Sequence, residues 1–186
     1  FAGNTKITSV VISEGVTGSG SGAFTGCTNL TSVTIPEGVT TIDGMTFGNC
    51  TSLTSVTIPG TVTSIEVQAF WNCSSLTSIT IPASVTSIGS GVFQGCTSLT
   101  SVKLSEGLTR IGDQTFGRCN ALETIEIPAS LTSIGNDAVK KCAKLRSIRC
   151  YANSSTWQPR YICDSNTTVY YSYNPNHTHS YKSHVI

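Results

Sequence analysis

The sequence predicts an α/β repeat solenoid, in which short strands and short helical turns alternate along one continuous stack of coils. Three observations predict this fold. A cysteine recurs every 23 residues, six times between Cys27 and Cys142. A leucine follows each of these cysteines at a distance of three residues, and branched aliphatic residues recur with the same period. A fixed period of this length indicates stacked repeats, because one unit cannot bury its apolar side chains without its neighbours.

Each unit is expected to open with a short strand. Leu30, Val33 and Ile35 are apolar, and the last three residues of this stretch alternate between apolar and polar, as in a strand with one buried face. Proline then ends the strand because it has no N–H to donate. This proline recurs at positions 36, 59, 82 and 128, and serine replaces it at position 105.

The rest of the unit is expected to return the chain to the next strand. A second short extended stretch, Val62 to Ile65 in one copy, leads into a turn and then a short helical turn. Phe93 and Cys96 lie three residues apart in that helical turn and would face the same side. With strands roughly 4.8 Å apart, about six coils would form an array about 30 Å long.

The unit reads Leu-x-x-Val-x-Ile-Pro-x-x-Val-x-x-Ile-Gly-x-x-x-Phe-x-x-Cys-x-x. It closely resembles the BspA-like (Treponema pallidum type) leucine-rich repeats of bacteria, over about residues 4 to 150. The resemblance implies a parallel β-sheet on the concave face of the solenoid. It also implies an extracellular protein, secreted or attached to the cell surface. Members of that class belong mostly to host-associated bacteria, and several act as adhesins.

The six periodic cysteines are expected to form a column of buried thiols, since the resemblance implies an inward-facing position. Stacked coils would bring neighbouring cysteines within disulfide reach, but with their Cβ vectors parallel, which disfavours a bridge. A straight row of single ligands does not suit a tetrahedral metal site either. Cys150 and Cys163 break the period. They are predicted to be either a bridge that staples the C-terminal end or two more buried thiols.

We expect the solenoid to span residues 1–150, a C-terminal cap residues 151–174, and a linker or the start of a following module residues 175–186. All six tyrosines lie beyond residue 150. A strand is expected at residues 167–173.

A terminal coil exposes an apolar end that needs covering. Trp157, Tyr161 and Ile162 are the candidates for this role, although aromatic clusters also bind sugars and peptides. The three histidines, at positions 177, 179 and 184, are interpreted as part of a flexible polar linker rather than a metal site.

The composition disfavours several classes of function. A net charge of +1 creates no field that would attract nucleic acid or a membrane surface. No apolar run is long enough to span a bilayer, so membrane insertion is not expected. The periodic part contains no histidine, and its carboxylates are scattered. We therefore expect no enzyme, no cofactor and no metal.

The outward positions of the strand row are the candidate binding surface, on the concave face. They are uniformly serine and threonine in the first three full coils and become charged from the fourth coil onward. Lysines at positions 140, 141 and 144 add positive charge on the last coil. The candidate ligand-binding residues are Thr57, Thr80, Lys103, Glu123, Glu126, Arg146 and Arg149.

Three functional hypotheses remain open. The first is an adhesin-like module that binds a protein or glycan on a host or microbial surface. The second is a structural spacer in a multidomain surface protein. The third is an ice-binding solenoid, suggested by Ser-x-Thr at positions 32/34, 55/57 and 78/80, although charged residues interrupt this array.

Overall fold

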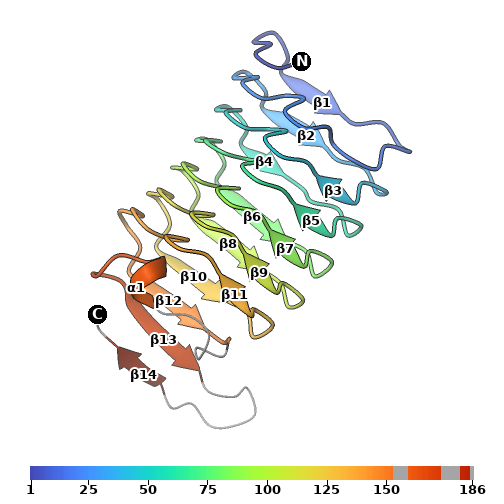
Figure 1. Ribbon diagram of the computed structural model, residues 1–186. Helices are drawn as coiled ribbons and strands as arrows, with labels where there is room; N and C mark the ends of the chain where they lie inside the picture. Colours follow the sequence, from blue (N-terminus) through green and yellow to red (C-terminus); the bar gives the residue numbers. More distant parts are fainter. Residues whose placement is uncertain (153–158, 173–180, 185–186) are drawn as a thin grey trace.

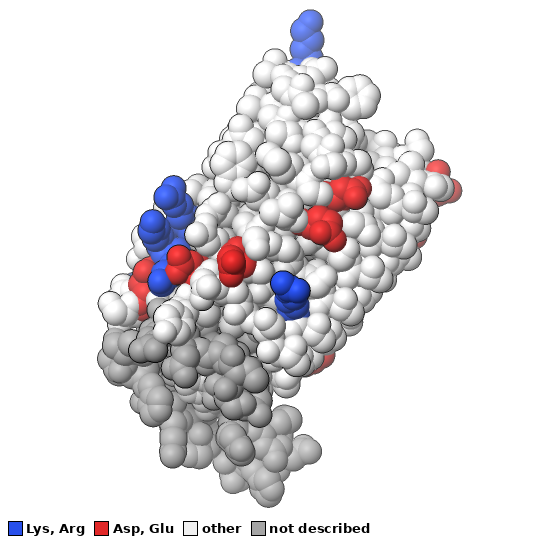
Figure 2. All heavy atoms as spheres, in the orientation of Figure 1, with Lys and Arg blue, Asp and Glu red and all other residues white. Residues whose placement is uncertain are grey.

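The computed structural model describes residues 1–152, 159–172 and 181–184. It shows a stack of coils with the N-terminus at one end and the last strands at the other (Figure 1). Each complete coil contributes one strand to each of two parallel rows. Charged side chains are sparse over the face drawn in Figure 2, in keeping with the 11% of charged residues. The predicted solenoid is confirmed, with strands as its main regular structure.

The first row is parallel and is divided among three sheets, β1-β2-β4, β6-β8 and the sheet that begins with β10-β12. Within each sheet, neighbouring strands of the row pair residues 23 positions apart, from Ser9 with Ser32 at one end to Ile125 with Ile148 near the other. Its strands are β1 (Ser9–Val11), β2 (Ser32–Thr34), β4 (Ser55–Val56), β6 (Ser78–Ile81), β8 (Ser101–Leu104), β10 (Thr124–Ile127) and β12 (Ser147–Cys150).

The second row is a five-stranded parallel sheet of two-residue strands, again in the 23-residue register. Each strand ends on a buried or partly buried isoleucine, which faces the core. The strands are β3 (Thr41–Ile42), β5 (Ser64–Ile65), β7 (Ser87–Ile88), β9 (Arg110–Ile111) and β11 (Ser133–Ile134).

The short helical turn expected in each unit is instead a run of hydrogen-bonded turns. The backbone N–H groups of Met45, Phe47 and Asn49 donate to carbonyl oxygens 22 residues later, at 3.0, 2.9 and 2.6 Å. Met45 and Asn49 have φ of 56° and 60°, in the left-handed region. Because left-handed residues at both ends of this run interrupt the helical backbone, its donors point along the stack rather than into a helix. The turns thus form a third hydrogen-bonded row.

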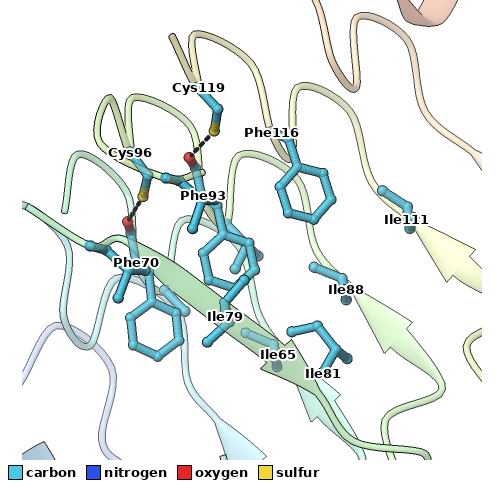
Figure 3. Packing of buried hydrophobic residues seen from close by; sticks show 14 of the residues in the cluster. Ile65, Phe70, Ile79, Ile81, Ile88, Phe93, Cys96, Ile111, Phe116 and Cys119 are labelled. Atoms are coloured by element: carbon cyan, nitrogen blue, oxygen red, sulfur yellow. Dashed lines mark hydrogen bonds between the residues drawn. The ribbon is translucent and has the colours of Figure 1, made fainter. Parts of the chain in front are cut away.

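Phenylalanine rings form a continuous stack through the core. Neighbouring rings lie nearly parallel, with centroids 5.4 to 5.7 Å apart. Figure 3 shows part of this stack beside the isoleucines of both strand rows. The rings belong to Phe1, Phe24, Phe47, Phe70, Phe93 and Phe116.

The predicted column of buried thiols is confirmed. Each of the six periodic cysteines donates its S–H to the backbone carbonyl oxygen found 26 residues earlier, at 3.1 to 3.4 Å. Figure 3 shows the bonds of Cys96 and Cys119. Burial, followed by the neighbouring Cys27, raises the pKa of Cys50 to about 12. Burial also raises the pKa of Cys142 to about 11. These thiols therefore stay protonated and pack as small apolar groups.

The C-terminal end continues the stack with a shorter coil. The predicted strand is β13 (Thr168–Ser172), which pairs in parallel with β12 at a spacing of 21 residues. β14 (Tyr181–His184) then pairs antiparallel with β13. The short helix α1 (Pro159–Ile162) precedes β13.

Ile162 is buried at this end of the stack, as expected, whereas Tyr161 remains 48% exposed. The backbone carbonyl oxygens of Tyr161 and Ile162 accept hydrogen bonds from the N–H groups of Asp137 and Val139, which continues the turn row into this coil. Cys150 and Cys163 are two buried thiols, which decides between the predicted alternatives. Trp157, His177 and His179 lie outside the described residues.

Candidate binding surfaces

The first strand row presents one exposed surface, here called the β-face. Side chains alternate along each strand, so in β10 Ile125 and Ile127 are buried while Thr124 and Glu126 are exposed. The 23-residue register aligns equivalent side chains in columns that run along the stack. Every predicted site residue is exposed on or beside this row, namely Thr57, Thr80, Lys103, Glu123, Glu126, Arg146 and Arg149.

The N-terminal half of the β-face is an array of hydroxyls, one column of which bonds to the backbone. Thr31, Thr54, Thr77 and Thr100 each donate their hydroxyl to the carbonyl oxygen 23 residues earlier, at 2.9 to 3.5 Å. A hydroxyl has only one proton to give, so each of these threonines presents only its oxygen lone pairs to solvent. This half therefore offers weak, uniform acceptors.

The C-terminal half of the β-face carries the charge. Arg149 donates to Glu126 at 3.0 Å, with both side chains more than half exposed, so this ion pair contributes little to stability. Lys103 and Glu126 line a hollow of about 300 Å³ across β8 and β10. Within the part of the chain that the structure describes, Lys103 and Arg146 have no ion-pair partner. Their charges remain available to a ligand.

A second hollow, which sequence reasoning missed, lies along the turns and is here called the turn groove. It has a volume of about 660 Å³. The residues that matter for its chemistry are Trp71, Asn72, Gln94, Thr97, Arg118 and Lys141.

The repeat pattern itself contained a signal for the turn groove. Arg118 and Lys141 occupy the 23-residue register of Asn72, so the stacking of the coils places all three in one column. Of the lysines expected to add charge on the last coil, Lys140 and Lys141 lie in these turns rather than in the strand row.

A smaller hollow of about 100 Å³ adjoins the turn groove and holds a compensated charge. Lys140 and Asp137 both line it, and they form an ion pair at 2.6 Å. The hydrogen bond to Asp137 raises the pKa of Lys140, and the carboxylates of Asp137 and Asp164 add to this effect. Figure 2 shows positive and negative side chains gathered at one edge of the stack, next to the C-terminal end.

The described residues offer little to other kinds of site. They contain no group of three or more histidine, cysteine or acidic side chains that could hold a metal ion. No helix in this part of the chain is long and apolar enough to cross a bilayer. The chemistry present is that of recognition, with aligned hydroxyls, amides and charges.

Comparisons with known proteins agree with this geometry. The model of the BspA type leucine rich repeat region matches residues 1–96 and 67–180. Among curated proteins, no sequence matches the chain.

Two solved structures resemble both the fold and the sequence. A leucine rich cell surface protein from Faecalibacterium prausnitzii is 36% identical with a TM-score of 0.75, over 89% of this chain and 43% of that one. The leucine rich repeat protein of T. pallidum is 31% identical with a TM-score of 0.71, over 78% of this chain and 68% of that one.

The pneumococcal vaccine antigen PcpA has the same fold. It is 23% identical with a TM-score of 0.66, over 77% of this chain and 40% of that one. This chain therefore spans less than half of the F. prausnitzii and pneumococcal structures.

Proposed function

Because this chain belongs to the BspA-type family of leucine-rich repeat proteins, we propose that it is an extracellular, adhesin-like binding module. The charged half of its β-face contacts a protein or glycan on a host or microbial surface. The F. prausnitzii relative is a cell surface protein, which supports an extracellular location.

One observation carries this proposal, namely the contrast between the two halves of the β-face. The threonine half is uncharged, and one column of its threonines donates its hydroxyl protons to the backbone. The other half offers Lys103 beside a hollow and Arg146 exposed. Charged groups steer encounter and provide specificity. They would therefore define the contact, while the threonines form a neutral flank.

The repeat supplies the substitutions for a test. Lys103 and Arg149 share their register with Thr80, and Arg146 shares its register with Thr100. The variant Lys103→Thr/Arg146→Thr/Arg149→Thr therefore places at each position a residue that the same fold already accepts. Binding to immobilised matrix proteins and to glycan arrays is measured by biolayer interferometry for this variant and the parent chain.

We expect the parent chain to bind at least one ligand, and the triple variant to bind it at least tenfold more weakly. The control is Thr54→Ser/Thr77→Ser, which keeps the hydroxyls of the threonine half and should bind like the parent. A ligand that binds the triple variant as tightly as the parent chain would contradict the proposed site. Absence of any ligand would favour the alternative function, a structural spacer in a multidomain surface protein.

A further inference from the structure

We propose that the turn groove binds an acidic saccharide, with Trp71 stacking on a sugar ring and Arg118 and Lys141 pairing with its carboxylates. This site lies apart from the β-face and does not rest on the function proposed for it. The inference depends on the size of the groove, the placement of its aromatic ring and the balance of charge around it.

The size of the groove suits a short oligosaccharide. Its volume of about 660 Å³ falls within the range of about 300 to 1,000 Å³ that ligand pockets occupy. Asn72 and Lys141 lie three coils apart in one register. With coils roughly 4.8 Å apart, they are separated by about 14 Å along the stack. A chain of several sugars could therefore contact both ends, whereas a single sugar could not.

Trp71 provides the apolar platform. Its side chain is half-buried and lines the groove. In the other coils the same register holds Thr25, Gly48, Gln94, Gly117 and Lys140, so packing does not require an aromatic residue there. An indole ring suits a ligand that presents an apolar face together with polar edges, as a pyranose ring does.

The amides beside Trp71 are held in place by their neighbours. Asn72 donates its side-chain N–H to the amide oxygen of Asn49 at 2.6 Å. Gln94 donates in the same way to Gln114. These bonds leave the carbonyl oxygens of Asn72 and Gln94 as acceptors. Acceptors of this kind suit sugar hydroxyls, which supply protons.

The other end of the groove carries positive charge. Arg118 and Lys141 are exposed, and no acidic side chain lines the groove with them. Arg118 and Lys141 also border the adjoining hollow, where Asp137 pairs with Lys140. The Asp164 carboxylate accepts the backbone N–H of Lys141 and leaves the ammonium group of that lysine without an ion pair among the described residues. The planar fork of an arginine matches a carboxylate with two parallel hydrogen bonds. The groove therefore selects a sugar with a carboxylate over a neutral one.

The test uses oligomers of galacturonic acid four to six units long, their methyl esters, and a heparin hexasaccharide, in calorimetry with the full chain. We expect the acid oligomers to bind at least tenfold more tightly than the methyl esters, which keep the rings but lose the charge. Tighter binding of heparin than of the acid oligomers would overturn the choice of carboxylate. Equal binding of acid and ester, or no binding of either, would overturn the proposal.

Matched variants locate the site. Asn72 already occupies the register of Arg118 and Lys141, with φ of 57° against their 61° and 60°. Arg118→Asn/Lys141→Asn therefore removes the charge at positions where asparagine fits the backbone. Trp71→Gln copies Gln94 in the next coil. Each variant should weaken binding of the acid oligomers at least tenfold.

The β-face variant Lys103→Thr/Arg146→Thr/Arg149→Thr serves as the control and should bind these oligomers like the parent chain. The reverse pattern, with loss of binding only in this control, would place the sugar on the β-face and overturn the proposal. Thermal unfolding of each variant verifies that it is folded before the affinities are compared.

Discussion

Replacing one ring of the phenylalanine stack should cost more in the middle of the stack than at its end. Phe70 is fully buried, with ring centroids 5.4 and 5.5 Å away on its two sides. Phe116 is equally buried but has a ring on one side only, at 5.5 Å, because Val139 takes the next place. Phe70→Leu therefore removes two ring contacts, whereas Phe116→Leu removes one.

The magnitude follows from that difference. Both substitutions remove the same atoms from the same kind of site, so the transfer and cavity contributions nearly cancel in the comparison. One ring pair contributes about 0.5 to 1.5 kcal/mol beyond its buried area. Phe70→Leu should therefore lower the free energy of unfolding by about 1 kcal/mol more than Phe116→Leu.

Urea unfolding followed by circular dichroism measures both variants against the parent chain. The comparison is valid if the free energy of unfolding falls with urea concentration at the same slope in both variants and in the parent chain. Equal losses, or a larger loss for Phe116→Leu, would show that the rings act only as apolar volume and that their stacking contributes nothing.

Other predictions address the thiols, the end of the turn row and the approach of neighbouring coils. The pKa of a cysteine thiol is near 9.0 in the unfolded chain, but burial raises it to about 12 for Cys50 and about 11 for Cys142. The free energy of unfolding should therefore be largest below pH 9 and fall as the pH rises above it. A melting temperature that stayed constant from pH 8 to 10.5 would contradict this. Asp164→Ala removes the carboxylate that accepts the last backbone N–H of the turn row at 2.7 Å. It should cost about 1 kcal/mol and speed amide exchange in the final coil. Gly112→Ala would place a Cβ 2.5 Å from a backbone nitrogen of the preceding coil and should cost about 2 kcal/mol in urea unfolding. Gly60→Ala, with open space around the Cβ, should be close to neutral.

The stacked core could be predicted from the sequence because the same contact repeats in every coil. A residue such as Cys73 meets its own equivalents on both sides, so a 23-residue period specifies the neighbours as well as the fold. The exposed threonines and charges followed from the alternation within each strand.

The turns and the last coil were harder to predict. Phe93 and Cys96, three residues apart, suggested one helical face, but the same spacing occurs in successive turns. What separates the two structures is the left-handed backbone at two positions four residues apart, the first of which Met45 and Gln68 occupy without a glycine to signal it. The coil that ends in β13 has a 21-residue spacing and lacks the repeat residues, so periodicity did not reveal it.

The turn groove escaped sequence reasoning for another reason. Trp71, Gln94 and Arg118 come from three successive coils, with Trp71 and Gln94 in one register and Arg118 in the adjacent one, and each looks like an isolated departure from the repeat. Only the stacking of the coils brings them to one hollow. A search for departures from the consensus that fall in adjacent coils would have found them.

The direction of the hydrogen bonds between coils has a mechanical consequence. In both strand rows and in the turn row, these bonds run along the stack and join each coil only to the next. The N-terminus and the last strands lie at opposite ends (Figure 1). Tension between the ends would therefore peel the coils apart one at a time rather than shear all of them at once. Each detached coil, 23 residues long, would release roughly 80 Å of extended chain in place of about 5 Å of stack. The molecule would lengthen in steps under load, with its remaining coils still folded.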